Sequence, residues 1–464
     1  MDRDSSEQPS LRTREAFAVA ALGFFATCLV FYPGFINNDS QWQLDQAQMG
    51  FFNNEHPPLM AFAWRYLEKL LPGGAGLFLF HGLLFWIGFA LFVSRVASSR
   101  GQALIACVGV SCFLPLLLSF GMLVKDGGFA YALALSSAAL LRAERSRSIA
   151  WIVVSMCALL YAVGLRHNGL GAALPLALWA GIIAAPRWQA MCARIGQAKT
   201  ATALGLIAFL YVGVGANLAN RLLTSQEAYP AQMMLTWDIT GVSVLSGRNY
   251  LPEFMTWDRR ELTLDELARV YSPESNYFIL WGPRTQPRPG WVYDDEGYAE
   301  LRAAWIRAVR EHPIAYLSHR MSAFIRFLGF RIRARAYWYP PSREIAAGRA
   351  WNSAIQSRLI GFAESHPQLI FFKAWFYVAI VALCVAVGAR RRFASVAFWA
   401  IGASGILYEC SYLFVSTAGD FRYSWWIMCV ALMLPALLAR DLARRPGASR
   451  GPGPSDPGCR LSPV

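Results

Sequence analysis

The chain has 464 residues, of which 56% are hydrophobic and only 16% are charged. Such a composition is too apolar for a soluble protein of this length, and repeated apolar runs of about 17 to 22 residues match the length that a helix needs to cross a bilayer. The net charge of +14 comes from short Lys and Arg clusters between these runs. Clusters of this kind are typical of cytoplasmic loops and anionic lipid contacts, and they argue against nucleic-acid binding.

The N-terminal end predicts how the chain enters the membrane. Residues 1–15 are polar and contain three arginines, so the positive-inside rule places them in the cytoplasm. The first apolar run, 16–32, ends in Tyr-Pro-Gly rather than in a small-residue cleavage site, so we expect it to remain as an anchor. Most of the nine cysteines fall inside predicted spans, and none lies between residues 221 and 365, so no disulfide framework is expected there.

Residues 16–220 are predicted to form a seven-span module in which each inward end meets a basic cluster. We expect its spans at residues 16–32, 77–94, 103–124, 127–141, 149–165, 169–186 and 201–220. The polar stretch 37–58 then becomes an external loop. The amphipathic stretch 59–71 follows it, is too short to cross the membrane, and is expected to lie in the interface.

The rest of the chain divides into a polar region and three further spans. Residues 221–368 are expected to form one larger external region, soluble or interfacial. Within it, residues 315–332 are apolar but carry Arg320 and Arg326, and a charge at mid-bilayer costs about 2.5 kcal/mol or more, so we expect an interfacial or re-entrant helix. Spans at 369–389, 393–415 and 423–439 bring the total to about ten. The tail, 441–464, is expected to be cytoplasmic and disordered.

Under this topology, polar residues at the ends of several spans emerge on the external side. They are Asp39, Asp45, His56, Lys125, Asp126, Arg166, His167, Asp420 and Arg422. Acids beside cations suit a transfer to a hydroxyl group, because a carboxylate takes the proton while the cations stabilise a phosphate leaving group. Asp39, Trp42, Gln43 and Gln46 share one helical face, which favours a binding site, whereas Asp45 points elsewhere and is expected to be structural.

Each of these residues also has a simpler interpretation. Asp39 could cap a helix, His56 could satisfy backbone groups in a turn, Lys125 and Asp126 could form a local ion pair, and Arg166 could reach toward lipid headgroups. Glu409 lies inside a span, where an acid usually has a partner or a function. His81, Lys373 and Asp238 are expected to be structural or interfacial. The sequence has no Walker loop, no Cys/His set with metal spacing and no Gly-x-Ser-x-Gly motif.

Several short motifs occur in an order that resembles a known superfamily. They are Asp39 soon after the first span, His56-Pro57-Pro58 later in that loop, Lys125-Asp126 after the third span, Arg166-His167-Asn168 after the fifth, and Asp420-Phe421-Arg422-Tyr423 before the last. Together with an interfacial helix in the first loop and a seven-span opening module, this order resembles the GT-C membrane glycosyltransferases. That group includes protein O-mannosyltransferases and the lipid A aminoarabinose transferase. The likeness covers about the first 220 residues.

The resemblance implies an inverting transfer of a sugar from a polyprenyl-phosphate donor to a glycan, lipid or protein acceptor on the external face of the plasma membrane. Asp39 would be the general base, and Asp126 would assist it or orient a cation. By the same resemblance, Lys125, Arg166 and Arg422 would bind the donor phosphate. The whole predicted substrate-binding set is Trp42, Gln43, Gln46, His56, Lys125, Arg166, His167, Asp420, Arg422 and Tyr423. A second candidate set for phosphate or headgroups is Arg320, Arg326, Arg331, Arg333 and Arg335. The sequence identifies no certain cofactor, and the need for a divalent cation stays open.

Two other classes of function compete with this expectation. A transporter or flippase for a lipid-linked or anionic solute would favour paired repeats and polar residues at mid-membrane depth. The sequence shows no clear repeat, and its polar residues lie at span ends. A non-catalytic assembly protein would not require so many acids and bases in the loops. Neither the sugar nor the acceptor can be named from these residues.

Overall fold

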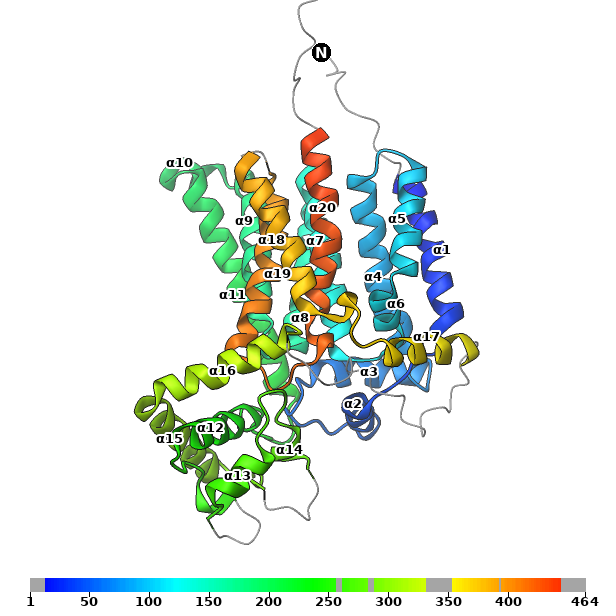
Figure 1. The fold of residues 1–464 in the computed structure, drawn as a ribbon. Helices are drawn as coiled ribbons and strands as arrows, with labels where there is room; N and C mark the ends of the chain where they lie inside the picture. Colours follow the sequence, from blue (N-terminus) through cyan, green and yellow to red (C-terminus); the bar gives the residue numbers. More distant parts are fainter. Residues whose placement is uncertain (1–12, 256–260, 283–287, 331–352, 392–393, 444–464) are drawn as a thin grey trace, which may run out of the picture.

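The computed structural model describes residues 13–255, 261–282, 288–330, 353–391 and 394–443. Two parts are visible in Figure 1: a bundle of long helices, and a group of shorter helices at one end of that bundle. The described part of the chain is helical apart from loops and three isolated β-bridges. The expected tail beyond residue 443, Arg331, Arg333, Arg335 and most of the N-terminal segment lie outside the described residues.

The bundle holds the apolar helices. These are α1 (Thr13–Phe31), α4 (Ala75–Val96), α5 (Arg100–Cys112), α6 (Leu114–Gly121), α7 (Lys125–Ser146), α8 (Ile149–Leu165), α9 (Leu170–Ala184), α11 (Gln197–Leu223), α18 (Ala374–Arg391), α19 (Val396–Val415) and α20 (Trp425–Ala443). In the described residues, six helical segments are long and apolar enough to cross a membrane, or seven if the bent pair α5 and α6 counts as one span. The chain is therefore a multi-pass helical membrane protein.

The third expected span, 103–124, is not one straight helix. It consists of α5 and α6, whose axes differ by 67° across Phe113. Pro115 lies in the first turn of α6, and its ring and missing N–H group are incompatible with a continuous helix through the preceding turn. This proline explains the break.

Helix α7 lies at the centre of the bundle and packs against α4, α8 and α20. Its sequence alternates large apolar residues with Gly, Ala and Ser, and nearly every residue from Asp126 to Leu141 is buried. Small side chains let neighbouring helices approach closely, which is the common packing mode between membrane helices. Lys125 and Asp126 begin this helix and are thereby fixed at the end of the bundle that faces the shorter helices.

The first loop forms two helices beneath the bundle in Figure 1, α2 (Asn38–Met49) and α3 (Leu59–Leu70). The expected amphipathic helix at 59–71 is confirmed as α3. Helix α2 begins at Asn37, whose side chain accepts a hydrogen bond from the Ser40 amide, and ends at Gly50 in the left-handed conformation. Asp39 consequently lies in the first turn of a helix, not in an irregular loop.

The segment that follows α11, beginning at Thr224, and the helices between residues 232 and 327 form the cap. They are α12 (Gln232–Ser246), η2 (Glu253–Met255), α13 (Leu264–Val270), α14 (Tyr277–Leu280), α15 (Asp295–Glu311) and α16 (Pro313–Phe327). The cap has an apolar core of its own, centred on α12 and α15. Helix α16, which covers the ambiguous stretch 315–332 as far as Phe327, is not among the candidate spans and lies across the ends of the bundle helices in Figure 1.

The remaining short helices lie at the two ends of the bundle. Helix α17 (Ser353–Ser365) contacts α1 and α6 beside the first loop, and η4 (Ile370–Phe372) precedes α18. At the opposite end are η1 (Ala185–Arg187) and α10 (Gln189–Ile195). The turn η5 (Phe421–Ser424) leads into α20 and brings its polar residues to the cap end.

Two backbone seams join the cap to the bundle. In the first seam, the amide of Ser225 donates to the carbonyl of Phe52 at 2.7 Å. In the second, the amide of Asn276 donates to Thr417 O at 3.0 Å and that of Gly419 donates to Glu274 O at 2.8 Å. The first seam holds the loop that leads to His56, and the second holds the loop that leads to Asp420. The cap thus fixes two segments that carry candidate site residues.

Candidate active site

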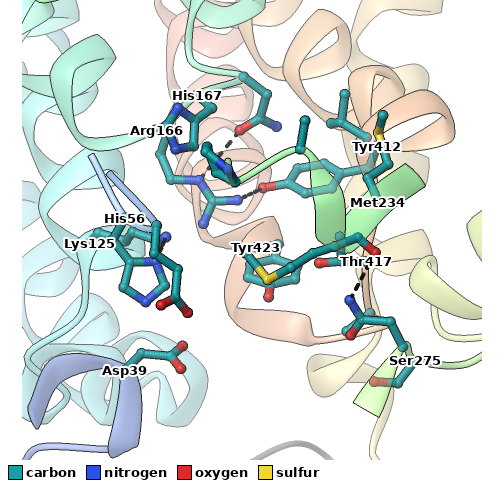
Figure 2. A pocket seen from close by; sticks show the side chains of 18 of the residues that line it. Asp39, His56, Lys125, Arg166, His167, Met234, Ser275, Tyr412, Thr417 and Tyr423 are labelled. Atoms are coloured by element: carbon teal, nitrogen blue, oxygen red, sulfur yellow. Dashed lines mark hydrogen bonds between the residues drawn. The ribbon is translucent and has the colours of Figure 1, made fainter. Parts of the chain in front are cut away.

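A cavity of about 510 Å³ lies between the cap and the end of the bundle. Figure 2 shows charged side chains on one side of it and Met234, Ser275 and Thr417 on the other. The bundle and the first loop contribute Asp39, Glu55, His56, Lys125, Arg166, His167, Asn168, Tyr412, Val415, Arg422 and Tyr423 to its lining. Residues predicted from separate motifs therefore share one cavity, although they are far apart in the sequence.

Two buried arginines are the centre of the charged side. Arg422 pairs with Asp39 at 2.7 Å and with Asp420 at 2.8 Å. Arg166 pairs with Asp126 and donates a hydrogen bond to the hydroxyl of Tyr412. Asp126 also lies 3.8 Å from Nε of Arg422, so the two arginines share it. A buried charge is costly unless it is paired, and here every arginine has an acid partner.

Aromatic rings hold the same two guanidinium groups from the side. The rings of Tyr412 and Tyr423 stack in parallel with their centres 5.5 Å apart. The guanidinium carbon of Arg166 lies 4.9 Å from the Tyr423 ring centre, and that of Arg422 lies 5.2 Å from it. Both distances are within the range of cation–π attraction. Acids and rings together fix the orientation of the two guanidinium groups.

Lys125 and His56 form a second contact on the charged side. Nζ of Lys125 lies 2.6 Å from Nδ1 of His56. Because an ammonium group can only donate, Nδ1 must accept and the imidazole must be neutral. Burial lowers the pKa of His56 well below its ordinary value, and the charge of Lys125 lowers it further. Burial also raises the pKa of the neighbouring Glu55.

Of the three aspartates that pair with the two arginines, Asp39 is the one that lines the cavity. Its side chain is 37% exposed, whereas that of Asp126 is 2% exposed. Burial alone would raise the pKa of Asp39, but the charges of Arg422 and Lys125 oppose this and the net direction is downward. Asp39 is therefore ionised at neutral pH and can only accept hydrogen bonds.

Asp126 and Asp420 are close to the cavity but do not line it. Asp126 lies behind Arg166 and Arg422, and one of its oxygens, Oδ2, lacks a hydrogen-bond partner among the described residues. Asp420 accepts from the amide of Arg422 at 3.1 Å through Oδ1, and its other oxygen pairs with the guanidinium. Both acids are placed to orient arginines. The expectation that Asp126 directly assists the base is not what this arrangement favours.

Three residues of the expected α2 face do not line the cavity. Trp42 is exposed on the outer side of the helix. Gln43 donates to the carbonyl of Asp39 at 3.2 Å, and Gln46 exchanges hydrogen bonds with Asn53 at 2.9 and 3.3 Å. These residues share one face of a helix, as predicted, but that face packs mainly against the protein. Gln46 supports the turn before Glu55 and His56 instead of contacting the cavity.

The structure adds lining residues that the motifs did not supply. Glu55 belongs to the polar stretch 37–58, whose side chains predicted a site for a polar ligand, but it was given no role of its own, and neither was Asn168 of the Arg-His-Asn motif. Asn168 contacts Nε of Arg166 at 3.4 Å and Ser411 at 3.2 Å. Tyr412 lies inside an apolar span, and nothing in its local sequence indicated a site.

One member of the second predicted set of cations, Arg320, is instead part of the cap interior. Arg320 is buried and pairs with Asp238 at 2.7 Å, so it is not available to phosphate or headgroups. Arg326 lies 3.8 Å from Glu274. The expectation that Arg320 contacts phosphate or headgroups was wrong, because the sequence shows an arginine that interrupts an apolar run but not its pairing with the distant Asp238.

A metal does not fit the acids that are present. Asp39, Asp126 and Asp420 are all paired with arginine, and the described residues contain no group of three or more His, Cys, Asp or Glu that could hold a metal ion. We therefore derive no step through a cation.

Comparison of the chain with protein families, curated proteins and solved structures gives no match. The function must be inferred from the residues and their geometry.

Proposed function

We propose that the protein is a membrane glycosyltransferase of the GT-C type, which moves a sugar from a polyprenyl-phosphate donor to a polar acceptor. One observation carries the proposal. A half-exposed carboxylate, Asp39, faces a cavity whose same side presents Arg166, Arg422 and Lys125, at the end of a membrane bundle. A base beside several cations, next to lipid, suits a donor that is both membrane-bound and phosphorylated.

The cations would bind the phosphate of the donor. Guanidinium groups bind phosphate through parallel N–H groups, and the two arginines are already oriented by Asp126, Asp420 and the tyrosine rings. Charge on the phosphate grows as the bond between the sugar and its oxygen breaks. Cations that their acid partners and the tyrosine rings already hold in place stabilise that charge without having to move during the reaction.

Asp39 would act as the base. The acceptor oxygen attacks the anomeric carbon and forms the new C–O bond, while the bond to the phosphate oxygen breaks and the phosphate leaves with the electron pair. The hydroxyl proton passes to Asp39. Attack opposite the leaving group inverts the anomeric centre. A single displacement of this kind needs no covalent intermediate.

Donor binding would also increase the basicity of Asp39. Arg422 now lowers the pKa of Asp39 through a 2.7 Å ion pair. A phosphate that shares the N–H groups of Arg422 weakens this pairing and adds a negative charge nearby, and both changes raise the pKa of the carboxylate. In this mechanism the base becomes effective only when the donor is in place.

The same proposal includes the full topology. The short apolar helices α8 and α18, the bent pair α5 and α6, and the buried helix α7 run alongside the six candidate spans, which supports ten crossings in the plasma membrane. The bundle end opposite the cap carries basic residues such as Arg95, Arg142 and Arg187, which supports a cytoplasmic location for that end and for both termini.

Single cysteines test this orientation. Gln48 in α2 and Ser146 at the end of α7 are both exposed. Each variant is made in a form of the protein whose native cysteines have been replaced, and it is expressed in intact cells. A membrane-impermeant thiol reagent should label Gln48→Cys and leave Ser146→Cys unlabelled. The reverse pattern would place the cavity in the cytoplasm and overturn the proposed orientation.

A transfer assay tests the activity itself. Membranes containing equal amounts of each variant are supplied with a radiolabelled polyprenyl-phosphate sugar. We expect Asp39→Asn to reduce transfer by about 10²–10⁴-fold, the usual contribution of a general base. The matched control is Asp45→Asn in the same helix, where Asp45 contacts Gln41 at 2.7 Å and does not line the cavity. Equal transfer by both variants would refute the assignment, and movement of labelled lipid without transfer would identify a flippase.

A further inference from the structure

The cap contributes a wall of different chemistry to the same cavity. Among the described residues, its lining set is Pro230, Ala231, Met233, Met234, Ser275, Asn276, Tyr277 and Trp281. None of these side chains is charged. The opposite side carries Lys125, Arg166 and Arg422, as Figure 2 shows for the first two. The charged side and the uncharged side of the cavity therefore suit different substrates of the proposed transfer.

Two aromatic rings are the most prominent feature of this wall. Tyr277 and Trp281 are one helical turn apart at α14, and the Trp281 amide donates to Tyr277 O at 2.6 Å. Their side chains are 53% and 50% exposed although both line the cavity. The Trp291 ring, 4.9 Å from Trp281, supports it from within the cap. Large exposed rings at a cavity are typical of a binding surface and are unusual for a packing surface.

Small hydrogen-bonding groups adjoin the rings. Ser275 and Asn276 precede Tyr277, and Thr417 lies across the second seam. Asn276 is held by its amide, which donates to Thr417 O at 3.0 Å. Hydroxyl and amide groups of this kind donate and accept hydrogen bonds without adding charge.

We propose that this wall is the acceptor subsite and that the acceptor is a neutral sugar chain. The inference rests on the proposed function, because it assigns the second substrate of the same cavity. A sugar ring has an apolar C–H face, which stacks on Tyr277 and Trp281, and hydroxyl groups at its edge, which bond Ser275, Asn276 and Thr417. An acidic glycan would find no cation on this wall. An extended peptide would find the backbone of Ser275 already bridged to Ala418.

Glycan binding by the purified full-length protein in detergent provides the test. The probe is an array of immobilised neutral and acidic oligosaccharides, with binding constants then measured by tryptophan fluorescence. We expect binding to neutral members, and we expect Trp281→Ala and Tyr277→Ala each to weaken it about tenfold, which corresponds to about 1.4 kcal/mol. The matched control is Phe278→Ala. Phe278 is 52% exposed on the same helix but does not line the cavity.

Additional variants separate the outcomes. Trp281→Phe keeps a ring and should retain most of the binding, which distinguishes lost stacking from a misfolded cap. Asp39→Asn should lose transfer and keep glycan binding. Two results would overturn the subsite even if transfer from the polyprenyl donor is observed. One is binding of neutral glycans that does not change when Trp281 or Tyr277 is substituted. The other is binding only to acidic glycans or peptides. Ring-dependent glycan binding without any transfer would keep the subsite and remove the proposed function.

Discussion

Two clusters of buried charges lie on either side of the boundary between the cap and the bundle, and they differ in one respect. In the cap, Asp238 pairs with Arg320 at 2.7 Å and lies 3.2 Å from His319, with all three side chains at most 1% exposed. Trp305 donates to the same carboxylate at 2.8 Å. In the cavity cluster, Arg422 is equally well paired, but its partner Asp39 is half-exposed.

The difference shows what distinguishes a structural ion cluster from a candidate site. The partners of Asp238 come from the protein on every side, and no described cavity residue belongs to that cluster. The Asp39 and Arg422 pair leaves one side open to about 510 Å³ of space. Arg320 also donates to the carbonyl of Ser416 at 2.8 Å, so the closed cluster supports the loop that leads to the open one. Contact with a cavity, not burial of charge, identifies the site.

Breaking the closed cluster should have the largest effect on stability. Arg320→Met leaves the carboxylate of Asp238 buried with only partial compensation, which typically costs about 3–5 kcal/mol. We expect this loss in the free energy of unfolding, measured by denaturant unfolding of the detergent-solubilised protein. Turnover per folded molecule should change by less than a few fold. A large loss of turnover at full stability would place Arg320 in the reaction instead.

Changing only the shape of the cation should distinguish the two clusters by activity. Arg422→Lys keeps the charge but loses the planar fork and the stacking on Tyr423. We expect proposed transfer to fall about 10²–10³-fold, the usual cost of one lost donor to a developing oxyanion. Arg320→Lys is the matched control and should transfer sugar at the wild-type rate per folded molecule. Equal rates for both lysine variants would contradict the assigned role of Arg422.

The pH dependence of stability sharpens the comparison. Burial raises the pKa of Asp420 to about 6, although Arg422 opposes the shift. Between about pH 4 and 6 the folded protein binds more protons at Asp420 than the unfolded chain, so the stability contributed by this group falls as the pH rises through that window.

Melting temperatures of Asp420→Asn and wild type, measured from pH 4 to 7, check this expectation. The wild type should lose more stability than the variant as the pH rises toward 6. His56 contributes with the opposite sign, because its lowered pKa makes the folded state bind fewer protons below pH 6.5. Including His56→Gln separates the two groups. Parallel curves for Asp420→Asn and wild type would refute the raised pKa.

The smallest effect is expected at Gln46. Its hydrogen bonds to Asn53 fix the turn before His56 but do not reach the cavity. Gln46→Ala should lower the free energy of unfolding by about 1 kcal/mol, the usual net value of a hydrogen bond. The KM for the labelled donor should remain near the wild-type value. An increase in this KM at unchanged stability would restore the sequence-based role of Gln46 in substrate binding.

The sequence predicted those features that depend on residues close together in the chain. His56 in the first loop, and Lys125, Arg166 and Arg422 at span ends, were assigned to the external side of the membrane. The structure brings these residues to one cavity. Charge patterns predict such placement because basic clusters and polar span ends are strongly biased by the bilayer. The helix at residues 59–70 followed from its apolar period for a similar reason.

The sequence was less informative where the outcome depends on distant contacts. The shared face of Trp42, Gln43 and Gln46 was visible, but its neighbours in space were not. The burial of Asp126 depends on Arg166 and Arg422, which belong to other helices. The neutral wall at Tyr277 and Trp281 exists because the cap is joined to two loops by backbone hydrogen bonds, and backbone pairing of this kind leaves no residue-specific signal.

The ion pair between Asp39 and Arg422 also has a consequence for biosynthesis. Asp39 lies in α2, before α4, and Arg422 lies in η5, after α19, so the bundle helices from α4 to α19 are all made between the two partners. The carboxylate and its guanidinium therefore cannot meet until α19 has been translated. A product that stops before η5 lacks this ion pair, and under the proposed function it would be inactive, however many of its helices have inserted.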